Sequence, residues 1–193
     1  MSAVAETTRY TPDDLLTMPD GDRFELVDGE LVEQDMGAQS SWIAGEILRT
    51  VGNFCSRHNL GWVFNADCGY QCFPDARDKV RRPDVSFIAR GRLPEDRIPD
   101  GHVPVPPDLA VEVVSPHDRF YEVERKVGEY LRAGVRLVWV VNPHERTVQV
   151  YRHDDSVSRL SETGELDGEG VLPGFRCPVR ELFPPQAQAT PAE

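Results

Sequence analysis

The chain has 193 residues, of which 39% are hydrophobic and 28% are charged. This length and composition predict one soluble globular domain and exclude a disordered chain, and no apolar run approaches the roughly 20 residues of a membrane-spanning helix. The formal net charge of −12 argues against simple electrostatic adhesion to nucleic acid. No basic segment followed by an apolar one opens the chain, so we expect a cytoplasmic location.

We expect a single domain over residues 1–183 and a loose tail over 184–193, where the sequence PPQAQATPAE is low in complexity. The four cysteines form no CxxC pair, so reduced thiols are expected and a structural zinc site is disfavoured. These cysteines are Cys55, Cys68, Cys72 and Cys177.

The first predicted elements are a short helix and a hairpin. In YTPDDLLTM, Thr11 is a typical N-cap and Pro12 a typical first helical residue. RFELVDGELVEQD contains two strand-like runs joined at Asp28-Gly29, which is a strong signal for a two-residue hairpin turn. A helix follows over 40–58, capped by Ser40 or Ser41, because its apolar residues recur at helical spacing.

The middle and C-terminal parts alternate between strands and one more helix. Strands are predicted near WVFNADCGYQCF, in RRPDVSFI and in DLAVEVV, with a proline-rich connection before the last of these. A helix over 119–133 ends at Gly134, and the apolar strand RLVWVVNP follows it. This strand–helix–strand order predicts a parallel pair in an α/β sheet. TVQVYRH is expected to pair antiparallel with RLVWVVNP, and the remaining segments to cover an edge.

Two apolar strands each contain one carboxylate, Asp84 in RRPDVSFI and Glu112 in DLAVEVV. A buried carboxylate is costly unless it is paired or binds a metal. Asp84 lies near the start of its strand and Glu112 near the end of its own, so their carboxylates are expected to converge. Together with the backbone carbonyl of Val113 they would form the all-oxygen site that Mg²⁺ (or Mn²⁺) prefers.

A lysine near such a site would assist phosphodiester cleavage, and Lys126 on the following helix is the candidate. The strand position two residues after Glu112 holds Val114, which cannot fill this role. Lys126 lies about 85° from the centre of the helix's apolar stripe, at the border of the buried face. The alternative is an ordinary surface pairing with Glu122 or Glu129 along the helix.

Basic residues surround Asp84 in the sequence, and two interpretations stay open. They form either a solvated loop of mixed charge or a local phosphate-facing patch on an acidic protein. The residues are Arg77, Lys79, Arg81, Arg82, Arg90 and Arg92.

The segments RRPDVSFI, PDLAVEVVSPHDR, RKVGEYLRAGVRLVWVVNP and TVQVYR, in this order, resemble the Uma-type ("Uma two") restriction endonuclease family of the PD-(D/E)XK nuclease superfamily. The opening hairpin also matches, so the resemblance covers about residues 10–183. It implies a restriction-endonuclease-like mixed sheet flanked by helices, with an N-terminal β-hairpin. The resemblance further implies a Mg²⁺-dependent endonuclease acting on DNA.

By this resemblance Asp84 and Glu112 hold the metal, and Lys126 is the catalytic lysine displaced from strand to helix. Glu25 also matches an acidic position of the family, with packing or capping of the hairpin as the alternative. Two more residues are supporting candidates independently of the resemblance: Glu46 could face the metal, although a solvated position is favoured, and His117 could line the same cleft, although a loop histidine is more often exposed. The family often has a histidine at the start of the first long helix, whereas this chain has Gln39-Ser40-Ser41-Trp42 there.

Two other functions remain open from the sequence. One is a binding or assembly module that keeps the nuclease fold with weak or no catalysis, which the net charge favours. The other, a carboxylate-pair hydrolase acting on sugars, is disfavoured because it needs neither lysine nor metal. The sequence leaves DNA against RNA, and monomer against homodimer, undecided.

Overall fold

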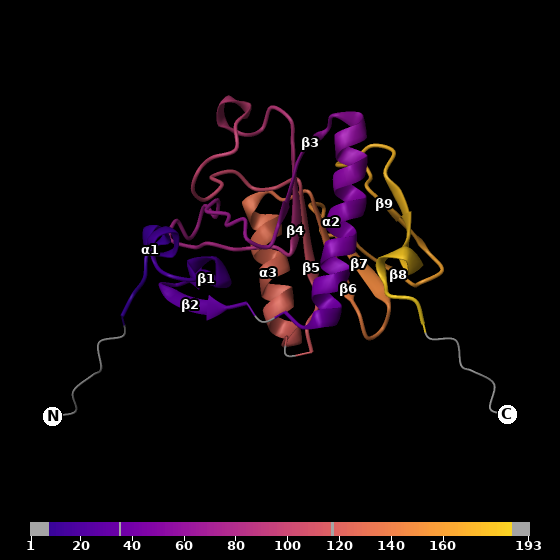
Figure 1. Ribbon diagram of the computed structural model, residues 1–193, viewed down its shortest axis with the longest axis horizontal. Coiled ribbons are helices and arrows are strands. Elements are labelled where there is room, and N and C mark those ends of the chain that lie inside the picture. The colour runs from indigo at the N-terminus through magenta and orange to yellow at the C-terminus, as the bar shows by residue number, and fades with distance from the viewer. Residues whose placement is uncertain (1–7, 35, 117, 187–193) are drawn as a thin grey trace.

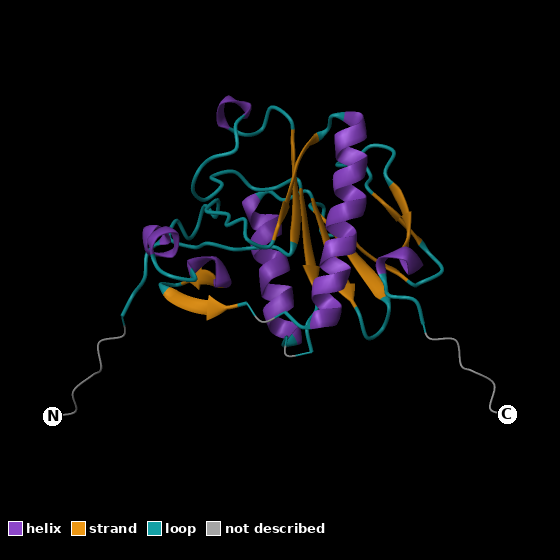
Figure 2. Ribbon diagram, viewed as in Figure 1, coloured by secondary structure: helices purple, strands orange, loops and turns teal. Residues whose placement is uncertain are grey.

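A computed structural model describes residues 8–34, 36–116 and 118–186. Its centre is a six-stranded mixed sheet with the order β3-β4-β5-β6-β7-β8, covered by helices α2 and α3 (Figures 1 and 2). The strands are β3 (Gly61–Asn65), β4 (Val85–Ala89), β5 (Leu109–Val113), β6 (Leu137–Asn142), β7 (Thr147–Arg152) and β8 (Val157–Leu160). The helices are α2 (Ala38–His58) and α3 (Phe120–Ala133). Within the described residues, no helix is both long and apolar enough to cross a membrane.

The two faces of the sheet are covered by different helices because side chains alternate along each strand. On one face, Val85 and Val111 pack with α2 residues such as Ile47 in the main hydrophobic core. On the other face, Ala110 and Val138 pack against α3. By the same alternation, Asp84 and Glu112 belong to the face that α3 covers.

Strands β5 and β6 are parallel and α3 connects them, which confirms the predicted strand–helix–strand unit. Nearly every residue of the two strands is buried, as expected for parallel strands covered on both faces. Gly134 ends α3 with φ +99°, a conformation that favours glycine. Strand β7 pairs antiparallel with β6, also as predicted.

The N-terminal helix and hairpin form as predicted. Helix α1 (Pro12–Thr17) has Thr11 as N-cap, with the reciprocal bonds of a capping box to Asp14. Strands β1 (Phe24–Val27) and β2 (Glu30–Glu33) pair through a turn at Asp28-Gly29, where both residues have positive φ. Two backbone hydrogen bonds between Leu26 and Val80 fix this hairpin to the segment that leads into β4.

Three expectations are corrected. Helix α2 begins at Ala38 after Gly37, so neither Ser40 nor Ser41 caps it. The predicted strand near WVFNADCGYQCF ends already at Asn65 in β3. The C-terminal segments do more than cover an edge: β8 extends the sheet, and the hairpin of β9 (Glu165–Asp167) and β10 (Arg176–Pro178) packs into the core beside α2. Short 3₁₀ turns lie at Gly21–Arg23, Pro94–Asp96 and Val179–Leu182.

Candidate active site

A cavity of about 220 Å³ lies where the N-terminal hairpin meets the start of β4, the end of β5 and helix α3. Figure 1 shows the hairpin beside α3. The charged residues that line the cavity include three buried carboxylates and one lysine. The lining residues used below are Glu25, Arg81, Asp84, Glu112, Val113, Ser115 and Lys126.

Asp84 and Glu112 meet in this cavity because β4 and β5 run antiparallel. The register pairs Val85 with Val111, so one step further Asp84 comes opposite Glu112. The Val113 N–H donates a 2.6 Å hydrogen bond to Oδ2 of Asp84 and fixes the orientation of that carboxylate. The expectation that both carboxylates face one pocket is confirmed.

Lys126 reaches the same cavity from α3. Its Nζ lies 3.3 Å from Oε2 of Glu112 and 3.3 Å from Oε1 of Glu25. Its side chain is 21% exposed, which agrees with a place at the border of the apolar stripe. The alternative pairing along the helix is wrong, because Glu129 instead binds Arg81 and Lys79.

The electrostatics of the two carboxylates favour a cation. Burial, reinforced by repulsion from Glu112, raises the pKa of Asp84 to about 8. Burial also raises the pKa of Glu112, although the Lys126 ammonium opposes this shift. A divalent cation between them would replace this repulsion with attraction, so the donor set fits Mg²⁺ or Mn²⁺.

The small number of side-chain ligands at the site favours Mg²⁺. Within residues 8–34, 36–116 and 118–186, no three His, Cys, Asp or Glu side chains are grouped as metal ligands. A cation held by Asp84 and Glu112 would therefore complete its shell with backbone oxygen or water. Mg²⁺ commonly binds in this way, through one or two carboxylates and several waters.

Behind Lys126 lies a row of alternating buried charges. Arg81, 1% exposed, donates to Glu25 through Nη1 at 2.7 Å and to Glu129 through Nε at 2.8 Å. Lys79 binds the other oxygen of Glu129 at 2.7 Å. We call this row the charge array: Lys79, Glu129, Arg81, Glu25, Lys126 and Glu112. Its three cations match its three carboxylates, so Asp84 is the carboxylate beside it that has no cation of its own.

The charge array also decides between the two interpretations of the basic residues. Arg81 and Arg82 are buried, and Arg82 donates to backbone carbonyls such as that of Phe24 at 2.9 Å. Lys79 is held by Glu129, and Arg92 by Asp108 at 2.9 Å. For Lys79, Arg81 and Arg82 both interpretations are wrong, since these residues form internal contacts, whereas Arg92 remains exposed beside Asp108.

The structure brings only one of the three supporting candidates into the cavity among the residues that it describes. Glu25 lies in the cavity, 1% exposed, and contacts Lys126. Glu46 does not: it pairs with Arg49 and lines a separate surface cavity that includes Trp42, so the expectation that it supports the site is wrong. His117 lies outside the described residues.

Two residues of the site were missed by the sequence analysis. The hydroxyl of Tyr130 donates a 2.7 Å hydrogen bond to Oε1 of Glu112. Tyr130 belongs to the predicted apolar stripe of the helix, so the sequence predicted that it is buried but not that its hydroxyl binds Glu112.

Ser115 also lines the cavity. It is 5% exposed, and its hydroxyl has no hydrogen-bond partner among the described residues. Buried hydroxyls are rarely left unpaired, which indicates a water or ligand atom beside it.

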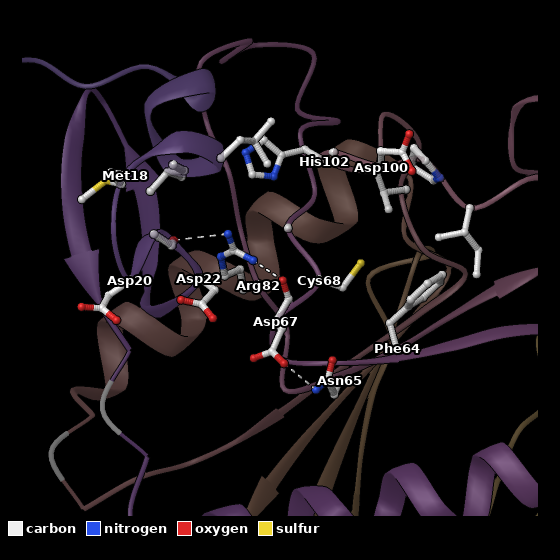
Figure 3. Close-up of a pocket in the computed structure, with 18 residues that line it drawn as sticks. Met18, Asp20, Asp22, Phe64, Asn65, Asp67, Cys68, Arg82, Asp100 and His102 are labelled. Carbon is white, nitrogen blue, oxygen red and sulfur yellow. Dashed lines mark hydrogen bonds between the residues drawn. The ribbon is translucent and has the colours of Figure 1, made fainter.

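A larger cavity of about 490 Å³ lies between α1, the end of β3 and the loop near His102 (Figure 3). Four aspartates line it: Asp20, Asp22, Asp67 and Asp100. Its buried cation, Arg82, is fully engaged with the carbonyls of Phe24, Asp67 and Gly21. This cavity therefore offers no combination of groups comparable to that around Asp84.

Comparisons with known proteins concern the fold and the family of the chain. The fold resembles the crystal structure of a protein described as "a putative nuclease belonging to DUF820" from Anabaena variabilis, with a TM-score of 0.75 and 21% sequence identity. The match covers 90% of this chain and 97% of that chain, and it confirms the expected fold class. Among curated proteins, none matched. The model of the Uma2 family, described as "Putative restriction endonuclease", matches residues 12–180, and the chain therefore belongs to this family.

Proposed function

We propose that the protein is a Mg²⁺- or Mn²⁺-dependent endonuclease that hydrolyses phosphodiester bonds of DNA. Asp84 and Glu112, with the carbonyl of Val113, hold the cation, and Lys126 assists the attacking water. The observation that carries this proposal is the contact of Lys126 with Glu112 at 3.3 Å beside the unmatched carboxylate of Asp84. Nuclease family membership supports the same reaction class.

The bound cation would supply Lewis-acid stabilisation of the phosphoryl oxygens and lower the pKa of a coordinated water. Lys126 has a different task. Burial alone would lower its pKa, but Glu112 and Glu25 outweigh burial and raise the pKa above the usual lysine value. Its ammonium is therefore protonated at neutral pH, so it donates hydrogen bonds to the water or to the phosphoryl oxygens and does not act as a base.

Two other groups hold the carboxylates in place. The Val113 N–H orients Asp84, and the Tyr130 hydroxyl orients Glu112. Both donors are buried and come from regular elements, β5 and α3. Groups fixed in this way lose little freedom when substrate binds, which favours a precisely placed cation.

The charge balance is consistent with a phosphodiester substrate. With all groups ionised, Asp84 and the charge array together carry one net negative charge. A divalent cation changes this to one net positive charge, and a bound phosphodiester brings the site to neutrality. For Asp84 and the charge array alone, the balance therefore matches one cation and one phosphate group; the lining of the cavity further includes Glu33, Asp118, Glu122 and Arg125.

The non-catalytic module remains the second candidate, because the chain has a net charge of −12 and nuclease binding to DNA depends on phosphate neutralisation. Incubation of the purified protein with supercoiled plasmid, with and without Mg²⁺ or Mn²⁺, separates the two. If the protein is an endonuclease, we expect nicking or linearisation of the plasmid, which EDTA stops and which the variant Asp84→Asn lacks. A parallel incubation with RNA shows whether the protein cleaves DNA, RNA or both. Absence of cleavage across several metals and substrates would favour the module.

A further inference from the structure

Lysine is rare in this chain, and its distribution is informative. The sequence contains 19 arginines but only two lysines, Lys79 and Lys126. Both belong to the charge array, Lys79 at one end and Lys126 next to the cavity. An ammonium is a compact point charge on a flexible stem, unlike the planar guanidinium of arginine. The ammonium of Lys126 therefore stays in one position only if neighbouring side chains hold it there.

The geometry shows what fixes it. Lys126 Nζ is equidistant from Glu25 and Glu112, at 3.3 Å from each. This is longer than the roughly 2.7–2.9 Å of a full charge-assisted hydrogen bond. The ammonium is therefore shared between two carboxylates: it donates a long hydrogen bond to Glu112 and forms an ion pair with Glu25.

Glu25 is also held by two other donors. Its Oε2 accepts from Arg81 at 2.7 Å, and its Oε1 accepts from the Arg82 backbone N–H at 2.9 Å. Arg81 is in turn fixed by Glu129, which Lys79 holds from outside. Glu25 thus connects the buried Arg81 and Glu129 to the flexible ammonium of Lys126 at the cavity.

We propose that Glu25 is a positioning residue that holds the Lys126 ammonium midway between two carboxylates, and so keeps Glu112 available to a divalent cation. This inference rests on the proposed function for its catalytic consequence. Without Glu25, the flexible stem of Lys126 would let the ammonium move among several positions, and in some of these it would approach Glu112 more closely and compete with the cation for its oxygen atoms. Arg81 supports the same role through Glu25.

The test needs a variant that removes Glu25 without leaving an unpaired buried charge, which would be strongly destabilising. The double variant Glu25→Gln, Arg81→Met removes one negative and one positive charge together. The introduced glutamine keeps an amide oxygen for the Arg82 N–H, and the introduced methionine fills much of the volume of Arg81. Glu25→Asp is a second variant that keeps the charge but shortens the side chain, should the double variant fail to fold.

The readout is NMR of protein labelled with ¹³C-lysine, which gives two side-chain signals that Lys79→Arg assigns. A fixed lysine shows two distinct Hε shifts, whereas a freely rotating one shows a single averaged shift. We expect distinct Lys126 Hε shifts in the wild type, with and without Mg²⁺, and averaging of these shifts in both variants. Glu30→Gln, an exposed change on β2, is the matched control and should leave the spectrum unchanged.

The kinetic readout separates positioning from binding. In the double variant we expect kcat for plasmid cleavage to fall about a hundredfold, with KM changed less than about twofold. Lys126 shifts that stay distinct in both variants would overturn the proposal. If the wild type neither cleaves DNA nor binds Mg²⁺, the proposed function fails, and the cation-free spectra still decide whether Glu25 fixes Lys126.

Discussion

The ammonium of Lys126 on helix α3 lies 3.3 Å from Oε2 of Glu112 on strand β5, fourteen residues earlier in the chain. The two come together because α3 packs back over the face of β5 that carries Glu112. Val114, two residues after Glu112, packs instead with the hydrophobic cluster beneath α3.

Replacing Lys126 tests its role in catalysis. Lys126→Ala should lower metal-dependent plasmid cleavage about a hundredfold or more, because one well-placed donor is lost. Lys126→Arg should not restore the activity, since the guanidinium has a different shape. The measurement is cleavage rate under saturating Mg²⁺. Equal rates for the wild type and both variants would remove Lys126 from the mechanism.

Lys126→Ala should also lower stability by more than the replacement of an ordinary exposed lysine on a helix. The side chain is only 21% exposed and bridges two buried carboxylates. We expect Lys126→Ala to lower the unfolding free energy by about 1–3 kcal/mol without metal, because Glu25 and Glu112 lose their shared cation. Mg²⁺ should recover part of this loss. Chemical denaturation with and without Mg²⁺ tests it, and a loss that Mg²⁺ leaves unchanged would contradict the shared role.

Cation binding itself should raise thermal stability. Mg²⁺ relieves repulsion between Asp84 and Glu112 in the folded state and has no such site in the unfolded chain, so Tm should rise with its concentration. The double variant Asp84→Asn, Glu112→Gln should lose this increase. Differential scanning fluorimetry across a Mg²⁺ titration measures it. A full Tm increase in the double variant would place the cation elsewhere on the acidic surface.

The pKa of Asp84 gives the metal-free protein a defined pH dependence. This pKa, about 8 in the folded state, lies above the ordinary value of 3.8, so the folded state holds the proton more tightly. Stability should therefore fall as pH rises from about 4 to 8, by at most about 1.4 kcal/mol per pH unit. Asp84→Asn should flatten this slope and be more stable than the wild type at pH 9. Urea denaturation in EDTA between pH 5 and 9 tests it, and parallel curves would contradict it.

Tyr130→Phe isolates the hydrogen bond that orients Glu112. The change removes only the hydroxyl that donates to Oε1 at 2.7 Å. Stability should fall by about 1–3 kcal/mol because a buried carboxylate loses a donor, and Mg²⁺ should bind more weakly. Calorimetric Mg²⁺ titration measures the affinity. Tyr151→Phe is a control on the same face of the sheet, where the hydroxyl binds Glu124 instead. Equal Mg²⁺ affinities for wild type and Tyr130→Phe would show that Tyr130 does not position Glu112 for the cation.

The sequence by itself determined what depends on local periodicity and turn chemistry. Strand alternation assigned Glu112 to its strand and Asp84 to the approach to another, although β4 itself begins one residue later, at Val85. Asp28-Gly29 fixed the hairpin through two positive φ values, and Gly134 ended α3. Helical spacing placed Lys126 at the border of the buried face. Each of these properties arises from neighbouring residues, so a single sequence contains it.

Only the tertiary structure decided which charges meet. Arg81 looked like part of a surface patch, yet it is 1% exposed and joins Glu25 to Glu129 across segments more than 40 residues apart. Glu46 was a candidate to face the metal although a solvated position was favoured, and it pairs with Arg49 outside the cavity. An ion pair depends on two distant segments approaching within a few ångströms. The spacing of residues along one strand or helix does not specify this approach; the docking of the hairpin and α3 onto the sheet does.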